Sequence, residues 1–226
     1  CIFFPIIFLV YGLGSLRQGL AIAYFFLFLY YDGNKYIKIS LAFVPLFFHV
    51  SSIFIILFYF TTQIFFISNT KEKIIYFIAS IVVVLSFLFY SDIFFGYVKY
   101  YVLQDTYKSV GAPFRAFLIS IFALIYLLKF SKKNTNPFYN FVKISSIFVL
   151  LVFPASFFFT TPVDRILAYF LILKLIISQE IINVFANKYK NLITLLLITM
   201  SFSYMVIWLY FGKNSYMWLN FETLFI

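Results

Sequence analysis

The sequence predicts an all-α, polytopic transmembrane protein, both from its composition and from the length of its apolar runs. Hydrophobic residues make up 65% of the 226 residues and charged residues only 11%, and the mean hydropathy is +1.04. Soluble domains carry about 25% charged residues, so this composition belongs to a different class. Runs of about 20 apolar residues recur along the chain, and a helix of that length can cross a bilayer.

We expect about eight membrane segments within a single integral-membrane domain over residues 1–226. The segments lie at 2–11, 15–31, 39–66, 74–90, 113–130, 141–159, 163–186 and 191–211. The first segment is short and the chain does not begin with Met. We therefore interpret the chain as a fragment that lacks further N-terminal helices.

Lysines are concentrated in alternate turns. Ten of the fourteen lysines fall in the turns at 32–38, 71–73, 129–143 and 188–190, against three in the opposite loops and tail. Because basic residues mark cytoplasmic turns, the loops at 91–112 and 160–164 are expected to face outward. The net charge of +10 is then explained by topology and by contact with anionic membrane lipids, without a nucleic-acid partner.

The segment at 39–66 is too long for one simple crossing. A straight helix of about 28 residues would measure ~42 Å, whereas the hydrocarbon core is ~30 Å thick. Basic turns also flank this segment on both sides. If both turns are cytoplasmic, the chain must pass through the membrane an even number of times between them. We therefore predict a re-entrant or broken element in which Pro45 interrupts the helix and the chain returns from His49. The alternative is one long tilted helix with Lys71 and Lys73 outside.

Arginine occurs at three positions, Arg17, Arg115 and Arg165, each at the outward end of a predicted segment. The planar guanidinium binds phosphate oxygens through two parallel bonds, whereas lysine acts as a point charge. This distribution indicates a diphosphate site near the outer leaflet. The alternative is that these side chains extend to the membrane interface without a ligand.

A histidine lies inside an apolar region, where polar groups are costly and often functional. His49 is followed by Ser51 and Ser52. Helical rise places Arg17 and His49 roughly 21 Å and 16 Å from the intervening turn, on one side of the bilayer. His49 could act as a general base or donate to phosphate, or it could simply bond a backbone carbonyl. Two helical faces are expected to meet there, formed by Arg17, Ala21, Tyr24, Phe28 and Tyr31 and by Pro45, His49, Ser52, Ile56 and Tyr59.

The remaining side chains support few other kinds of site. No Asp-x-Asp pair or His-x-x-x-His pattern occurs, and Cys1 is the single cysteine, so we expect no metal and no cofactor. Tyrosines cluster in the outward loop at 97–107. They are expected to form an interfacial belt, with sugar contact as the alternative, and Tyr100 is our candidate for such a contact.

Several of these motifs resemble those of the EpsG family. The likeness rests on Arg17-Gln18-x-x-Ala21, a short basic turn, His49-x-Ser51-Ser52, Asp164-Arg165-x-x-x-Tyr169 and the Tyr/Lys-rich loop at 97–101. Family members usually carry a Pro-Tyr pair near the C-terminus, where this chain has Trp218-Leu219-Asn220-Phe221, and several helices before the Arg-Gln motif.

The resemblance implies a Wzy-like polymerase of bacterial surface polysaccharides, with a GT-C-like architecture. Such a glycosyltransferase moves a growing glycan from undecaprenyl diphosphate onto an acceptor repeat unit of O-antigen, capsule or exopolysaccharide. It would work at the outer face of the inner membrane, with a chain-length regulator protein as a further partner. The alternatives are a flippase for the same lipid-linked oligosaccharide and a structural subunit of a larger synthase.

The chemistry and the resemblance together give the candidate site. We expect catalytic roles for His49, Arg17 and Arg165. Substrate contacts are expected from Gln18, Ser52, Arg115, Tyr169 and Tyr100.

Overall fold

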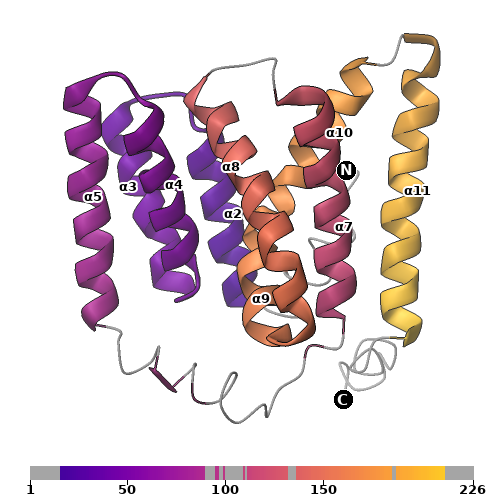
Figure 1. The fold of residues 1–226 in the computed structure, drawn as a ribbon, viewed down its shortest axis with the longest axis horizontal. Coiled ribbons are helices and arrows are strands. Elements are labelled where there is room, and N and C mark those ends of the chain that lie inside the picture. The colour runs from indigo at the N-terminus through magenta and orange to yellow at the C-terminus, as the bar shows by residue number, and fades with distance from the viewer. Residues whose placement is uncertain are drawn as a thin grey trace, which may run out of the picture. The chain divides into compact units, whose positions relative to one another are not determined.

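The computed structural model describes residues 16–89, 95–96, 99, 109, 111–131, 136–184 and 187–211 (Figure 1). These residues divide between two compact units, one drawn from 1–19 and 178–226 and the other formed by Leu20–Ile177. Helices and turns make up the described part of the chain, which contains no strand. The all-α class is therefore confirmed, while the single domain over 1–226 stays a prediction.

The helices follow the apolar segments closely. The described elements are α2 (Leu16–Tyr30), α3 (Lys35–Phe48), α4 (Ser52–Phe66), α5 (Thr70–Phe89), α7 (Ala112–Ile125), the π-helix η3 (Tyr126–Phe130), α8 (Pro137–Val152), the 3-10 turn η4 (Phe153–Phe157), α9 (Thr160–Leu167), the 3-10 turn η5 (Ala168–Phe170), α10 (Leu171–Val184) and α11 (Asn187–Phe211). The predicted segment at 2–11 lies outside the described residues.

Three stretches are long and apolar enough to cross a membrane. They are Ala112–Phe130 with 19 residues, Pro137–Phe157 with 21 and Thr160–Val184 with 25. Leu16–Tyr30 and Ser52–Phe66 are shorter apolar helices. The chain is therefore a helical membrane protein, whereas the count of eight segments and the GT-C-like architecture stay predictions.

Asparagine side chains begin three helices at the lysine-rich turns. The Oδ1 atoms of Asn34, Asn69 and Asn136 accept the backbone N–H two residues further on, at 2.9, 3.0 and 3.1 Å. Each bond satisfies one of the four N–H groups that have no partner within the first helical turn. Pro137 takes the first position of α8, where the missing N–H of proline costs nothing.

The broken element between the basic turns is present, but the break is not at Pro45. Pro45 lies inside α3, which continues to Phe48, and α4 begins at Ser52. The Lys35 Nζ atom lies 3.0 Å from Glu72 Oε1, so the starts of α3 and α5 lie at the same end of the second unit. The prediction of one long tilted helix is therefore wrong.

The break falls at His49 because this residue leaves the helical conformation. Its φ of −153° and ψ of 125° are extended. Proline removes one helical N–H donor, a loss that membrane helices tolerate, so Pro45 alone does not end α3. With 14 and 15 residues, α3 and α4 are only ~21–23 Å long, shorter than the ~30 Å hydrocarbon core.

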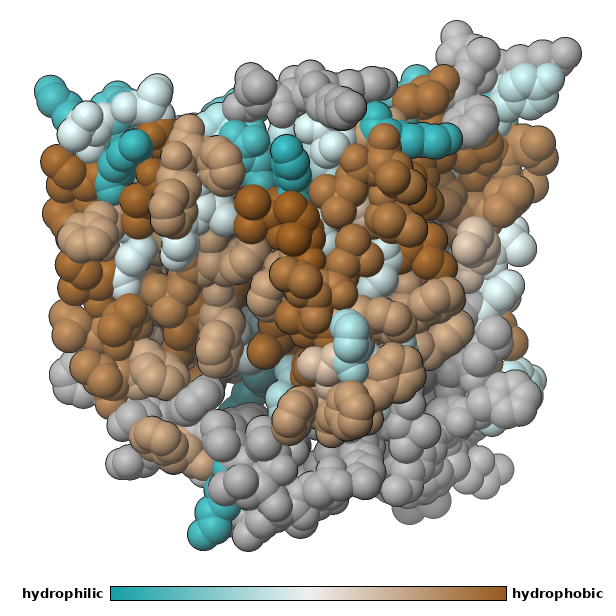
Figure 2. Space-filling model, viewed as in Figure 1, coloured by the Kyte–Doolittle hydropathy of each residue, from teal (hydrophilic) through white to brown (hydrophobic). Residues whose placement is uncertain are grey.

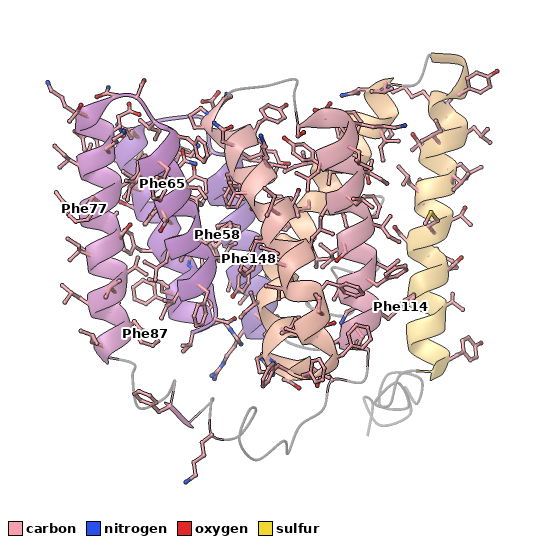
Figure 3. All side chains as sticks on the ribbon, in the orientation of Figure 1. Phe58, Phe65, Phe77, Phe87, Phe114 and Phe148 are labelled. Atoms are coloured by element: carbon pink, nitrogen blue, oxygen red, sulfur yellow. The ribbon has the colours of Figure 1, made fainter. Side chains whose placement is uncertain are left out.

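Aromatic side chains fill the interior of the second unit. Phe28 on α2 packs edge-to-face on Tyr59 with ring centroids 4.8 Å apart. The rings of Phe58 and Phe148, from α4 and α8, are tilted with centroids 5.1 Å apart, and the two residues are neighbours in Figure 3. Contacts between offset or tilted rings add to the stability gained from burial, so they hold the helices in register around the break.

The outer faces of the helices are also apolar. Phe65 on α4 and Phe77 on α5 are 75% and 56% exposed, and Phe77 points outward from α5 in Figure 3. Figure 2 shows an apolar surface over α4 and α5, with polar residues gathered where α5 begins. An apolar exterior bounded by a polar end is what contact with lipid requires.

Candidate functional site

The backbone of the break fixes the position of His49. Its N–H donates to the Pro45 carbonyl at 3.1 Å, which closes the last turn of α3. Its own carbonyl accepts from the Ser52 N–H at 3.0 Å and from Ser52 Oγ at 2.7 Å, which begins α4. Ser52 is fully buried. The Ser52 hydroxyl therefore holds the turn that carries the histidine.

The His49 ring contacts an arginine from a distant helix. Arg165 on α9 places Nη1 3.2 Å from His49 Nε2. A guanidinium can only donate, so this contact needs a lone pair on Nε2. At the other ring nitrogen, Nδ1 lies 2.6 Å from Ser51 Oγ, and the Ser51 backbone N–H donates to Nδ1 at 3.2 Å. Donors therefore approach the ring at both nitrogens, with Arg165 at Nε2 and Ser51 at Nδ1.

Ser51 links the histidine to a buried tyrosine. The Ser51 hydroxyl donates to the Tyr169 phenolic oxygen at 3.3 Å. Tyr169 lies in η5, is 1% exposed and packs edge-to-face on Phe25 at 6.2 Å. We name these contacts the His49 network, which consists of His49, Ser51, Arg165 and Tyr169. It brings together three of the predicted site residues and adds Ser51.

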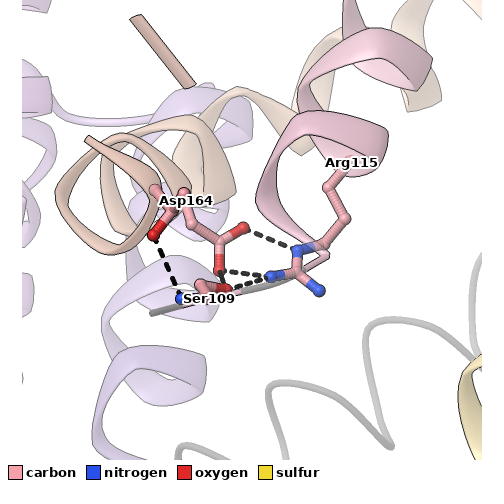
Figure 4. A network of polar contacts seen from close by, with 4 residues as sticks. Ser109, Arg115 and Asp164 are labelled. Atoms are coloured by element: carbon pink, nitrogen blue, oxygen red, sulfur yellow. Dashed lines mark hydrogen bonds and ion pairs between the residues drawn. The ribbon is translucent and has the colours of Figure 1, made fainter. Parts of the chain in front are cut away.

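A second polar cluster includes Asp164, the residue that precedes Arg165 in α9 (Figure 4). Arg115 Nε and Nη2 donate to Asp164 Oδ1 and Oδ2, each at 2.6 Å, and Nη2 also donates to Ser109 Oγ at 2.6 Å. Ser109 donates from Oγ to Asp164 Oδ2 at 3.0 Å and from N–H to Thr160 Oγ1 at 3.1 Å. We name these four residues the Asp164 network. The sequence predicted that Arg115 binds a diphosphate and did not predict its pairing with Asp164.

The two networks gather at the end of the second unit opposite the lysine-rich turns. Arg115 is in the first turn of α7, whereas Lys129 lies in the last turn of the continuing helix. Fourteen residues separate them along the chain, or ~21 Å of helical rise. Arg115 and Arg165 therefore share an end with His49, in agreement with the segregation of arginine from lysine in the sequence.

Other predicted site residues are not members of either network. Arg17 is exposed and Gln18 is 3% exposed, both in the first turn of α2. They belong to the other compact unit, so their association with His49 stays a prediction. Tyr100, like the other tyrosines of the loop at 97–107, lies outside the described residues. Among the residues that the structure describes, no three His, Cys, Asp or Glu side chains are grouped so as to hold a metal ion.

Comparison with known proteins gives one match. The family model described as the EpsG family matches residues 1–223, nearly the whole chain. No curated protein and no solved structure matches the chain.

Proposed function

The chain belongs to the EpsG family of Wzy-like polysaccharide polymerases, and from this premise we propose that it is an integral-membrane glycosyltransferase. Its substrates are lipid-linked oligosaccharides: a growing glycan on undecaprenyl diphosphate as donor and a new repeat unit as acceptor. The observation that carries the proposal is the contact between Arg165 and His49. It pairs a phosphate-binding group with a potential base.

The proposed reaction is a displacement at the anomeric carbon of the donor sugar. An acceptor hydroxyl forms the new C–O bond, the bond from the anomeric carbon to the diphosphate oxygen breaks, and the hydroxyl proton passes to a base. Negative charge grows on the departing diphosphate. A guanidinium at that position stabilises this charge strongly, because water is partly excluded there.

The contact between Arg165 and His49 supports a coupled role for Arg165. Arg165 lies at Nε2, while Ser51 contacts Nδ1 through its hydroxyl and its backbone N–H. When Arg165 turns to a bound diphosphate, the lone pair becomes available to the acceptor hydroxyl. Diphosphate binding would thus expose the base at the moment when the leaving group is in place. His49 in this role is a general base with its second nitrogen oriented by Ser51.

The other predicted residues have roles that follow from their chemistry. Arg17 would add a second guanidinium for phosphate, and Gln18 a hydrogen-bonding amide beside it. Ser52 would hold the turn of His49, Tyr169 would complete the network, and Tyr100 would contact sugar. The site would face outward from a bacterial inner membrane, where O-antigen, capsule or exopolysaccharide is assembled, with a chain-length regulator protein as partner.

Variants at His49 test this proposal. The assay follows elongation of purified lipid-linked repeat units, beside a measurement of their binding to the same variant. If His49 takes the proton, His49→Ala lowers turnover by roughly 10²–10⁴ and leaves binding nearly unchanged. If His49 donates to phosphate, His49→Gln keeps much of the activity and binding weakens in step with the rate.

Two results would contradict the proposal. A stable and fully active His49→Ala protein would remove His49 from the site. A wild-type protein that moves lipid-linked repeat units across the membrane, without forming glycosidic bonds, would show a flippase instead. In both cases the protein is first shown to be in the membrane at normal level.

A further inference from the structure

The Asp164 network lies directly beside the arginine that contacts His49. We propose that it is a positioning device: Arg115, acting through Asp164, orients Arg165 toward His49. The effect on turnover rests on the proposed function, whereas the effect on the geometry of His49 does not. Arg115 is then a positioning residue, and not the diphosphate ligand that the sequence indicated.

The first argument is the placement of Asp164 and Arg165 on one short helix. α9 has eight residues and packs against both α7 and α4. Successive side chains on a helix point about 100° apart. Asp164 is held on the side of α7 by Arg115, so Arg165 points in another direction, where it meets His49. Rotation of α9 would break both contacts together.

The second argument is that the network holds α9 at two points. Ser109 donates to Thr160 and to Asp164, four residues apart and therefore on one face of the helix. The carboxylate also receives two bonds from Arg115. Two attachment points along one face fix the rotation of a helix, whereas a single point would allow it to turn.

Gly111 offers a way to disturb this guanidinium without removing a charge. A Cβ atom at Gly111 would lie 2.8 Å from Arg115 Nη1. The guanidinium thus lies directly against this glycine, and a methyl group there would push the end of the flexible arginine side chain aside. Gly111→Ala is therefore a second variant that moves the Arg115 guanidinium.

A phosphate would have to compete with the carboxylate for the same guanidinium. The Arg115 and Asp164 side chains are 16% and 20% exposed, so both charges are largely removed from water. Withdrawing the guanidinium would leave a carboxylate charge without its counter-charge beside an incoming anion, which is strongly unfavourable. The Arg115–Asp164 pair is therefore better suited to holding α9 in place than to binding a phosphate.

Turnover measurements on purified protein give the first test. We expect Arg115→Gln and Gly111→Ala each to lower kcat by about 10²-fold, as a small misplacement of a reacting group can do, with KM changed little. In an Arg165→Gln background, Arg115→Gln should add no further loss, because the group that it positions is gone. A further loss of the same size in that background would overturn the inference and return Arg115 to the substrate.

A spectroscopic test does not depend on activity. His49 is the single histidine of the chain, so isotope-labelled histidine, in protein purified without a histidine tag, reports one imidazole by nitrogen NMR. The wild-type spectrum gives the reference position for Nε2, the nitrogen that faces Arg165. Gly111→Ala should shift the Nε2 resonance away from that position. Lys35→Gln, which breaks the ion pair with Glu72 at the opposite end, is the matched control and should leave the spectrum unchanged.

The two tests separate this inference from the proposed function. If the wild type does not elongate lipid-linked repeats, the proposed function fails, and the spectra still decide the role of Arg115. Gly111→Ala keeps every charged group, so it remains informative if Arg115→Gln does not fold. Unchanged imidazole resonances in Gly111→Ala, together with wild-type kcat, would overturn the inference.

Discussion

Arg165 Nη1 lies 3.2 Å from His49 Nε2, although 116 residues separate the two in the chain. The contact joins α9 to the break between α3 and α4, where Ser51 approaches the same ring at Nδ1. Because arginine only donates, the contact with Arg165 needs a lone pair on Nε2. A change at either residue is therefore expected to alter the other.

The first prediction concerns the geometry of the guanidinium. Arg165→Lys keeps the positive charge but loses the planar fork that matches phosphate oxygens. We expect this variant to lose most of its polymer-forming activity while it remains in the membrane at near-normal level. Polymer length on gels, beside immunoblots of membrane fractions, measures both.

Lys71→Arg is the matched control for that change. Lys71 is exposed at the opposite end of the second unit, so a change between the two cations there should leave the polymer unaffected. Polymer of normal length in Arg165→Lys would remove the argument that Arg165 recognises phosphate geometry.

The second prediction separates the two hydroxyls of the His49 network. Tyr169→Phe keeps the ring on Phe25 and removes the phenolic oxygen that Ser51 and Ser52 contact. We expect at most about a tenfold loss of turnover, the effect of an ordinary hydrogen bond. Ser51→Ala removes the hydroxyl that lies beside His49 Nδ1 and should cost more. Initial rates on one substrate preparation measure both, and a larger loss in Tyr169→Phe would contradict this order.

The broken element could be predicted from the sequence because charge and length both required it. Two lysine-bearing turns at one end demand an even number of passes, and 28 residues are too many for one crossing. The position of the break was not predictable in the same way. It depends on the extended backbone of His49, whereas Pro45, the usual indicator, is accommodated inside α3.

The pairing of Arg115 with Asp164 could not be predicted from the sequence either. The two residues are 49 positions apart on different helices, and no periodic pattern relates them. A carboxylate and a phosphate also offer a guanidinium the same pair of oxygens. Residue type alone therefore did not distinguish an internal partner from a substrate, and the helix packing was needed.

The third prediction concerns the ion pair between α3 and α5. The Lys35 and Glu72 side chains are 32% and 37% exposed, so water screens their attraction. We expect Lys35→Gln to change the free energy of unfolding by only about 0–1 kcal/mol, and by less at high salt. Thermal unfolding in detergent at two salt concentrations measures this. A much larger loss, independent of salt, would show that the pair does more than join two helix ends.

The fourth prediction concerns the aromatic interior. Phe141 is fully buried and contacts Phe25, Phe58 and Tyr59. Phe141→Ala would leave a cavity among these rings, and we expect a loss of about 3–5 kcal/mol in unfolding free energy. Phe77→Ala on the exposed face of α5 is the control and should cost far less. Equal losses in the two variants would contradict the assignment of Phe141 to the core.

The last prediction concerns orientation. Because lysine-rich turns stay in the cytoplasm, the turns at 32–38 and 67–73 should face inward and the loop at 91–112 outward. Single cysteines in a Cys1→Ser background test this with an impermeant maleimide. Gly96→Cys, where an added side chain meets nothing within 4 Å, should be labelled from outside the cell. Asp32→Cys and Ser68→Cys, both exposed, should be labelled only after the membrane is permeabilised.

The reverse pattern would place His49 and the two networks at the cytoplasmic face and contradict an outward polymerase site. Labelling of Asp32→Cys and Ser68→Cys from opposite sides would contradict the ion pair that joins the starts of α3 and α5, and with it the broken element that carries His49.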